Sequence, residues 1–506
     1  MSRLLFLFAL CLMALAPSRL AADPGDIDAA SRGVARVVLV GMKDERPQFM
    51  GHGTGFAVTS TMLVTNAHVV EDAARRQNML VVVIPSEGDG ASRARVVAID
   101  RANDLALLEL VDELRLPPLV LRTNFVADDN EVVALGYPGV VDRALSGSIR
   151  DWVAAQPPVK TRGFVSGQRD LRGTASILHS ADIAGGNSGG PLVDDCGRVL
   201  GVNRAVTLSR QGEGEFYFAI SNRELMPFLR ANDVEAATTD IECRSLADIE
   251  RAEAERREAA QAQAAAARAE REAETEQLRD EIEEDVREER ENMMALAAVL
   301  LLIAAAGGFF AAQARQRRSS GSRVYVFAGI AGVAIIGAGL AWITRPGNSE
   351  VEDRLAAALG GDSEGESAGN GPLAAGKLTC TLDLDRSRIT SDPDRDVEFE
   401  WDADGCVNGR TQYGREGARW SRVFVPNEEA VVSINQIDSD AREYRIERYL
   451  IGRNGMALAR DTRQSYDPPT CGAINAADRL GEMQADVLSQ LPDQPNERLI
   501  YTCENR

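Results

Sequence analysis

The sequence predicts a multidomain protein. Along the chain we expect an all-β domain, then a long charged helix, then two membrane-spanning helices, and last a small disulfide-linked α+β domain that is mainly β. Short apolar runs separated by Gly, Pro, Asp and Asn fill the first part, an Ala-, Glu- and Arg-rich stretch without Gly or Pro follows, and then come two uncharged apolar stretches. At 506 residues the chain is too long for a single core.

The N-terminus has the layout of a signal peptide. Arg3 precedes an apolar run over residues 4–15, and the small residues Ala21 and Ala22 follow it. The apolar run is too short to span a bilayer comfortably. We therefore expect residues 1–22 to be removed on export.

The first folded domain is expected over residues 27–232. Apolar runs such as residues 37–40, 81–84 and 105–108 have strand length and are bounded by turn-forming residues. Residues 224–229 have the pattern of a helix that closes the domain.

A long helix is expected next, over residues 245–292, because strong helix formers carry many opposite charges at helical spacing. Its apolar residues are too sparse for a sustained a/d seam. The pattern therefore favours a solvated stalk over a tight coiled coil.

Two membrane helices are expected at residues 293–314 and 324–343, since both stretches are apolar and uncharged over about the length of a bilayer span. The short loop between them, residues 315–323, is dense in arginine, which is typical of a cytoplasmic loop. The pair is predicted to be a hairpin with both ends outside the cytoplasm. Small residues four apart would let the helices approach closely, and they are Ala304 with Gly308 and Ala328 with Gly332.

Beyond the hairpin we expect a flexible linker over residues 347–376, rich in Gly, Ser and acidic residues, and an extracytoplasmic domain over residues 377–506. Alternating apolar residues predict strands there, Asn454-Gly455 predicts a hairpin turn, and residues 476–491 predict a helix on the sheet.

The cysteines outside the signal peptide are even in number, as an oxidising compartment favours. Two precede the membrane helices and four follow them, so one bridge is expected in the first part and two in the last, with three connectivities open for the last four. The six candidates are Cys196, Cys243, Cys380, Cys406, Cys471 and Cys503.

The net charge of -21 argues against nucleic acid as a partner, because phosphate binding needs a basic surface. Neither a metal site nor a cofactor is predicted.

The most informative stretch is Gly-Gly-Asn-Ser-Gly-Gly-Pro-Leu at residues 185–192. A nucleophilic serine needs an exposed hydroxyl on a tight turn and backbone N–H groups that converge on the developing oxyanion. Flanking glycines permit such a turn. Ser188 is therefore a candidate nucleophile, and the amides of Gly186 and Ser188 are the expected oxyanion hole.

A serine hydroxyl needs a base to take its proton, and a carboxylate to orient that base. The chain has three histidines. His68 lies just after the strand expected to start at residues 53–56, His52 precedes that strand, and His179 lies close to Ser188. Asp104 heads the apolar run Leu105–Leu108, where it could be partly buried.

These motifs resemble those of the trypsin-like (chymotrypsin-fold) serine proteases, and within them the bacterial high-temperature-requirement branch. Further matches are Gly-Thr-Gly-Phe at 53–56, Ala-Leu-Gly-Tyr-Pro-Gly at 134–139 and Gly-Phe-Val-Ser-Gly at 163–167. The resemblance covers about residues 32–230. It implies two six-stranded antiparallel β-barrels, with a catalytic triad of His68, Asp104 and Ser188 in the cleft between them.

Three further residues are candidates for substrate binding. Asp182 lies six residues before Ser188, where trypsin itself carries the aspartate that binds basic substrate side chains. The high-temperature-requirement branch, by contrast, prefers small aliphatic substrate residues before the cleaved bond. His179 is a weaker candidate for the rim of the pocket, and Asn203 lies on a strand that builds it.

The sequence departs from that branch because no PDZ-like segment is recognisable after the first domain. The resemblance implies a membrane-anchored serine endopeptidase that acts on protein or peptide substrates in quality control or regulated proteolysis. We expect it at a bacterial inner membrane with both folded domains on the periplasmic side, in contact with the lipid bilayer, and with the stalk or membrane helices able to form a homo-oligomer. The alternative is a ligand-gated or inactive binding module controlled by the C-terminal domain.

Overall fold

The computed structural model describes residues 24–506, except 44–45, 77, 89, 125–127, 146–151, 207–215, 317–320, 360–371 and 418. It divides into two units, one of Met1–Glu253 with Pro372–Arg506 and one of Ala254–Gly371. The predicted signal peptide lies outside the described residues.

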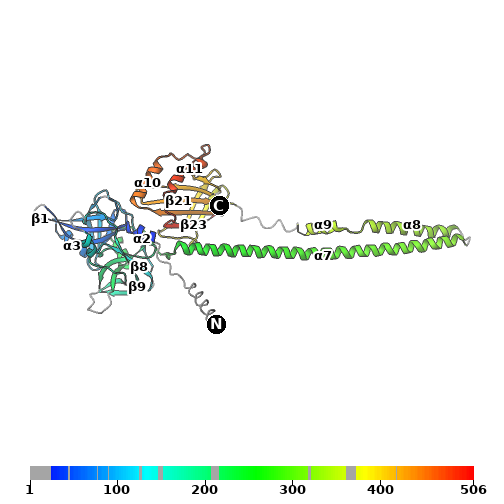
Figure 1. The fold of residues 1–506 in the computed structure, drawn as a ribbon, viewed down its shortest axis with the longest axis horizontal. Helices are drawn as coiled ribbons and strands as arrows, with labels where there is room; N and C mark the ends of the chain where they lie inside the picture. Colours follow the sequence, from blue (N-terminus) through cyan, green and yellow to red (C-terminus); the bar gives the residue numbers. More distant parts are fainter. Residues whose placement is uncertain are drawn as a thin grey trace, which may run out of the picture. The chain divides into compact units, whose positions relative to one another are not determined.

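The first part of the chain, coloured blue in Figure 1, forms a closed antiparallel barrel. Its strand order is β1-β2-β3-β6-β5-β4. Its interior is filled by β-branched and aliphatic side chains such as Val37, Leu63, Val83 and Leu108, which suit a pleated, buried surface. Helix α2 precedes its first strand, and helix α3 lies between β3 and β4 in the chain. The bounds are α2 (Pro24–Ser31), β1 (Val34–Lys43), β2 (Arg46–Ala57), β3 (Met62–Thr65), α3 (Ala67–Arg75), β4 (Met79–Pro85), β5 (Ser92–Asp100) and β6 (Leu105–Leu110).

A second barrel follows in the order β11-β8-β9-β10-β13-β12, and the pairing of β11 with β12 closes it. The short strands β7 and β14 extend the sheet beyond β12. The prediction of two six-stranded barrels is confirmed. The bounds are β7 (Leu121–Arg122), β8 (Glu131–Gly136), α4 (Gly139–Leu145), β9 (Val159–Leu171), β10 (Thr174–His179), β11 (Pro191–Val193), β12 (Val199–Val206), β13 (Tyr217–Ser221), α6 (Asn222–Arg230) and β14 (Thr238–Thr239).

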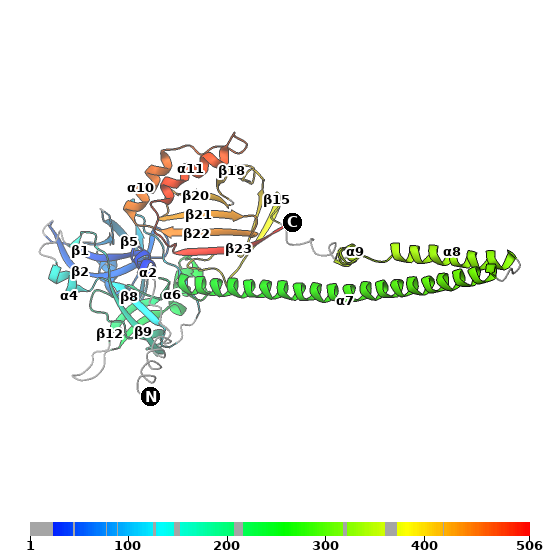
Figure 2. The same cartoon turned by 45° about the vertical axis from the view of Figure 1, so that its right-hand side comes forward.

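The C-terminal domain is built on a nine-stranded antiparallel sheet in the order β18-β17-β16-β15-β23-β22-β21-β20-β19 (Figure 2). The α10 and α11 helices cover one region of it, where Met456 and Val487 pack on Val432 and Tyr449. The bounds are β15 (Gly376–Leu382), β16 (Asp396–Trp401), β17 (Cys406–Val407), β18 (Thr411–Gln412), β19 (Gly414–Glu416), β20 (Arg419–Phe424), β21 (Val431–Asp438), β22 (Glu443–Leu450), α10 (Arg453–Gln464), α11 (Ala476–Leu488) and β23 (Glu497–Asn505).

A glycine inside α11 lets this helix lie directly on the sheet. A Cβ atom at Gly481 would come within 2.6 Å of the Arg415 carbonyl oxygen, and one at Gly414 within 2.6 Å of the Gly481 nitrogen. Glycine inside a helix costs about 1 kcal/mol relative to alanine. The close approach of the two backbones explains why it is tolerated here.

The barrels and the C-terminal domain belong to the same unit and share a buried ion pair. Arg388 lies before β16 and Asp26 in α2, and their side chains are 1% and 3% exposed. Arg388 Nη1 donates to Asp26 Oδ1 at 3.2 Å, and Asn496 Nδ2 donates to the same oxygen at 2.9 Å. Arg32 Nη1 donates to the Leu450 carbonyl oxygen at 2.6 Å. The C-terminal domain is therefore joined to the first domain by buried polar contacts.

The other unit is helical. The predicted stalk and first membrane helix are one continuous helix, α7 (Leu246–Gln316), which begins in the first unit and is followed by α8 (Gly321–Ile343) and α9 (Asn348–Leu359). A Cβ atom at Gly307 would come within 3.1 Å of the Phe327 carbonyl oxygen, so α7 and α8 approach closely there. At Gly308 and Gly332, where such contacts are predicted, an added Cβ atom would meet nothing within 4 Å. The small-residue packing is thus displaced by one residue on α7.

Two local predictions are wrong. Residues 348–359 form α9 where a flexible linker is predicted, while 360–371 lie outside the described part of the chain. Asn454-Gly455 lies in the first turn of α10 and is no hairpin turn. This helix is stable there because Met456 and Ala459, three residues apart, bury one face of an otherwise polar segment.

The cysteine predictions are confirmed. The bridge in the first part is Cys196–Cys243, and those in the last domain are Cys380–Cys503 and Cys406–Cys471. Cys380 and Cys503 are directly opposite each other on β15 and β23.

Candidate active site

His68 and Asp104 are held together at one end of the first barrel. His68 lies in the first turn of α3, and Asp104 directly precedes β6. His68 Nδ1 lies 2.9 Å from Asp104 Oδ2 and 3.1 Å from Oδ1, and the His68 backbone N–H donates to Oδ1 at 3.0 Å. Asp104 has φ 56°, and its backbone oxygen accepts from Ala67 N–H and from Asn66 Nδ2. These contacts fix both side chains relative to α3.

The carboxylate of Asp104 remains ionised although it is largely buried. Burial alone would raise its pKa, but the hydrogen bonds and the charge of His68, together with the charge of Arg204, hold the pKa of Asp104 below its ordinary value. The His68 ring, by contrast, is 52% exposed. An ionised carboxylate on Nδ1 leaves Nε2 of this ring to act as a base.

Ser188 lies in the loop between β10 and β11, which is anchored from two sides. Thr54 N–H on β2 donates to the Ser188 carbonyl at 2.9 Å, and Gly189 N–H donates to the Asn203 carbonyl at 2.9 Å on β12. Ser188 Oγ donates to the Arg204 carbonyl oxygen at 3.4 Å. Among the described residues no hydrogen bond joins Ser188 Oγ to His68. Such contacts are often long before substrate binds.

Gly186 has the backbone conformation that an oxyanion loop needs. Its φ is 107°, a region that favours glycine, and its carbonyl accepts from Thr54 Oγ1 at 2.7 Å. Within the described chain, neither the Gly186 nor the Ser188 N–H donates to a protein acceptor. Both donors are therefore free to receive a negatively charged oxygen.

Replacing Gly186 by alanine is expected to lower kcat of any Ser188-dependent hydrolysis by at least about 10²-fold, the cost of losing one oxyanion donor. A Cβ atom would lie 2.3 Å from the Tyr137 carbonyl oxygen and 2.6 Å from His52 Nε2, so the loop must move. Gly185→Ala is the matched control, because a Cβ there meets nothing within 4 Å. Equal kcat values for the two variants, measured on one peptide substrate, would contradict the assignment of Gly186.

The three predicted substrate-binding residues lie in different surroundings. Asp182 is exposed, and its Oδ1 accepts from Tyr217 OH at 3.0 Å. His179 is fully buried on β10, where burial lowers its pKa to about 4, so it is no rim residue. Asn203 is also fully buried and donates through Nδ2 to the Pro191 carbonyl at 3.1 Å. Of the three, only Asp182 is accessible to a substrate.

Arg204 is a site residue that the sequence analysis missed. Its Nε lies 3.2 Å from Asp104 Oδ2. It directly follows Asn203 on β12, but a contact between residues so far apart in the chain leaves no local signal in the sequence.

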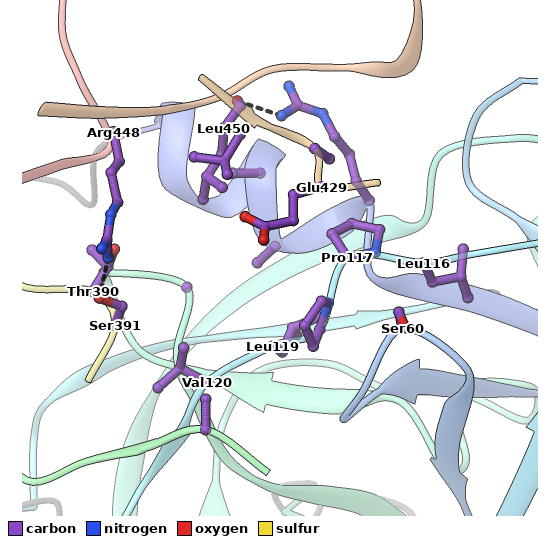
Figure 3. Close-up of a pocket in the computed structure, with 18 of the residues that line it drawn as sticks. Ser60, Leu116, Pro117, Leu119, Val120, Thr390, Ser391, Glu429, Arg448 and Leu450 are labelled. Carbon is purple, nitrogen blue, oxygen red and sulfur yellow. Dashed lines mark hydrogen bonds between the residues drawn. The ribbon is translucent and has the colours of Figure 1, made fainter. Parts of the chain in front are cut away.

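A cavity of about 720 Å³ lies between the first domain and the C-terminal domain (Figure 3), and its lining includes none of the predicted triad residues. Leu116, Pro117 and Leu119 form an apolar wall, and Arg448 lies at one end, where it donates to Ser391 Oγ at 2.9 Å.

A smaller, acidic pocket of about 310 Å³ surrounds Asp195. Burial, followed by the charges of Glu131 and Asp194, raises the pKa of Asp195 from 3.8 to about 6. Because of this raised pKa, the folded state binds the proton more tightly than the unfolded state does, and protonation of Asp195 favours folding. This contribution to the free energy of unfolding is lost as the pH rises from about 4 to about 6.

We expect Asp195→Asn to stabilise the protein at pH 8 by about 1 kcal/mol, a value discounted because the group is partly exposed. The gain should vanish near pH 4. Denaturant unfolding at the two pH values measures it, with Asp129→Asn in the same pocket as the control. A gain that is equal at both pH values would contradict the shifted pKa.

Comparison with known proteins agrees with this geometry. Residues 53–202 match a family model described as "Trypsin-like peptidase domain". The chain is 35% identical over 186 residues to "Serine protease HTRA2, mitochondrial" of Bos taurus, covering 36% of this chain and 37% of that protein. It is 35% identical over 167 residues to "Serine protease Rv3671c" of Mycobacterium tuberculosis, covering 33% of this chain and 39% of that protein.

A third relative is "Magnetosome formation protease MamE" of Paramagnetospirillum magneticum, 31% identical over 185 residues, covering 35% of this chain and 23% of that protein. The crystal structure of the active form of the Rv3671c protease aligns with 26% identity and a TM-score of 0.32, covering 43% of this chain and 89% of that one. The chain spans well under two thirds of the length of each of these three relatives. The part of the chain built on the two barrels is a trypsin-like peptidase domain similar to those of the HtrA-type serine proteases.

Proposed function

We propose that the chain is a membrane-anchored serine endopeptidase with His68, Asp104 and Ser188 as its catalytic triad. The observation that carries the proposal is the pairing of His68 Nδ1 with a buried, ionised Asp104, beside a glycine-flanked Ser188 whose loop is anchored to both barrels. Each element corresponds to one requirement of acyl transfer.

The geometry supports the following steps. His68 Nε2 takes the proton of Ser188 Oγ as this oxygen attacks the carbonyl carbon of a peptide bond. Asp104 orients the ring and stabilises the imidazolium, and the N–H groups of Gly186 and Ser188 bind the oxyanion. The imidazolium then protonates the leaving amine, and water hydrolyses the acyl-enzyme in the same manner. Apart from the peptide and the water, every group that acts in this scheme is a side chain or backbone N–H of this chain.

Membrane anchoring is supported by the two apolar helices. The apolar part of α7 and residues Val324–Ile343 of α8 are long and apolar enough to cross a bilayer. They expose large apolar side chains such as Leu302, Val333 and Ile336. Exposure of such apolar surface to water is unfavourable, whereas contact with lipid chains is not. Asp26 and Arg388 come from chain segments on either side of the pair and meet in one unit. If both helices cross the bilayer, the chain returns to the side from which it entered, as this contact requires.

An extracytoplasmic position for both folded domains is supported by the disulfides, which occur on both sides of the hairpin in sequence. Disulfides persist in oxidising compartments and are rare in the cytosol.

Asp182 is proposed to face the side chain that precedes the scissile bond. Its carboxylate is exposed and is held by Tyr217 OH, so it could pair with a basic residue there. Profiling of cleavage sites in a peptide library, with Asp182→Asn for comparison, tests this: a preference for Arg or Lys that the variant loses supports the role, and an unchanged profile contradicts it.

The proposed activity is tested by labelling the detergent-purified protein with a fluorophosphonate, which reacts with activated serines. Wild type should be labelled and Ser188→Ala should not. Equal labelling of the two proteins, or no labelling of a correctly folded wild type, would contradict constitutive activity.

The alternative of a gated protease is favoured by one observation, the polar contacts of the C-terminal domain with the rest of its unit. The ion pair with α2 is buried, and those with the start of α7 are partly exposed. Labelling that appears only when this interface is disrupted, for example in Arg388→Met, would identify the C-terminal domain as a gate.

A further inference from the structure

Arg204 occupies an irregular position in β12. The pairing of β12 with β13 shifts register between Asn203 and Ala205, so Arg204 is the extra residue of a β-bulge. A bulge redirects its side chain and increases the local twist of the strand. Here the redirected guanidinium reaches Asp104, with Nε 3.2 Å from Oδ2, and the two side chains are 22% and 11% exposed.

The main chain of the same residue reaches the serine. The Arg204 carbonyl oxygen accepts from Ser188 Oγ at 3.4 Å. One residue thus contacts two of the three predicted triad members, one through its side chain and the other through its backbone.

Asp104 has enough hydrogen bonds to be oriented without Arg204. Its carboxylate already accepts from the backbone N–H and from Nδ1 of His68, and its backbone oxygen accepts from Asn66 and Ala67. Arg204 therefore contributes its permanent positive charge, which lies next to the same carboxylate that accepts the hydrogen bond from His68.

The other charged groups near this carboxylate are on α3 and the loop before β6. Glu71 on α3 lies close enough to Asp104 for the two charges to interact, and Glu71 is itself paired with Arg75 and Arg101. Glu71 is partly exposed, and Arg75 on α3 and Arg101 in the loop before β6 are each 60% exposed, so solvent screens these charges. Among the described residues, Arg204 is the arginine that contacts the carboxylate directly.

We propose that Arg204 is a positioning residue that shares the Asp104 carboxylate with His68 and thereby moderates the strength of His68 as a general base. The inference rests on the proposed triad. When His68 takes the proton of Ser188, its ring becomes an imidazolium. Two positive charges, this imidazolium and the Arg204 guanidinium, then lie beside the Asp104 carboxylate. The guanidinium disfavours that second charge, because like charges close together raise each other's free energy.

Removing the charge of Arg204 should therefore favour the imidazolium. The acid limb of the pH profile of kcat/KM should move to higher pH by about one unit, and kcat/KM on the alkaline plateau should rise by a few-fold, since a stronger base transfers the proton more readily.

The experiment compares full-length wild type with Arg204→Gln, which is neutral and similar in length, and Arg204→Lys, which keeps the charge. The profile is measured from about pH 5 to 9 on one peptide substrate, with Ser188→Ala as the blank. Arg162→Gln, at an exposed ion pair with Glu131 on the second barrel, controls for the loss of one positive charge elsewhere. We expect a shift in Arg204→Gln and none in Arg204→Lys or Arg162→Gln.

An unshifted limb in Arg204→Gln, or equal shifts in the Gln and Lys variants, would overturn the inference. Complete loss of activity in a correctly folded Arg204→Gln would also overturn it, because the proposed role is moderating. If Arg204→Gln does not fold, Arg204→Met, which keeps the apolar stem of the side chain, replaces it.

A second readout separates this inference from the proposed function. In the Ser188→Ala background, the titration of the His68 ring can be followed by NMR, and its midpoint should rise by about one unit on Arg204→Gln. Absence of Ser188-dependent hydrolysis in wild type would count against the proposed function alone. An unchanged His68 midpoint would count against Arg204 alone.

Discussion

The double variant Ser188→Ala/His68→Ala is expected to hydrolyse a peptide no more slowly than either single variant. Each single change should lower kcat by about 10⁶-fold, the effect of removing the nucleophile or the base of a serine protease triad. A base without a nucleophile has no proton to take, and a hydroxyl without a base is hardly nucleophilic, so the second loss adds nothing. The residual rate should come from binding and from the N–H groups of Gly186 and Ser188.

The measurement is kcat for the two single variants and the double variant on one peptide substrate. His52→Ala is not a suitable control, because His52 Nε2 lies 2.9 Å from the Tyr137 carbonyl, next to the oxyanion loop. Asp72→Asn is a better control, since this residue lies one turn further along α3 and its side chain is 61% exposed. Additive losses, with the double variant far below both singles, would mean that Ser188 and His68 act independently and would refute the triad.

Replacing Asp26 by alanine is expected to lower the free energy of unfolding by about 3–5 kcal/mol, the cost of leaving a buried charge without its partner. The Arg388 guanidinium is 1% exposed and would lose a bidentate carboxylate between two domains. Urea unfolding of the detergent-solubilised protein, followed by tryptophan fluorescence, measures the loss.

Asp28→Ala is the matched control, on the same helix. Asp28 pairs with Lys160, but the two side chains are 55% and 35% exposed, so the expected loss is below about 1 kcal/mol. The double variant Asp26→Leu/Arg388→Met should recover most of the stability, because buried ion pairs can be replaced by apolar pairs at little cost. Equal losses for Asp26→Ala and Asp28→Ala would show that the ion pair does not join the domains.

The sequence predicted those features that depend on neighbouring residues. The loop at 185–190 could be recognised because its glycines, including Gly186 at φ 107°, serve a local turn. The cysteines could be assigned to two groups because the membrane helices separate them in the chain. The apolar stretches of α7 and α8 are likewise each continuous in the chain, so the sequence alone could reveal them.

Features that depend on distant segments were missed or misjudged. His179 was predicted at a pocket rim, but its burial arises from neighbouring strands of the second barrel, which a linear pattern does not reveal. The α10 helix was misjudged because Asn454-Gly455 favours a turn locally, whereas the burial of Met456 against the sheet favours a helix. Arg204 reaches Asp104 only because a bulge redirects it, and a bulge has no reliable signature in one strand.

The unit that holds both folded domains is made of two chain segments, with residues 254–371 inserted between them. If the proposed hairpin anchors the protein, this unit is tied to the bilayer twice, once through α7 and once through the chain that follows α9. A single cut in either connection would leave the enzyme attached through the other. Shedding of a soluble form would require two cuts, and the released product would consist of two polypeptides that none of the three bridges joins, since each bridge lies within one segment.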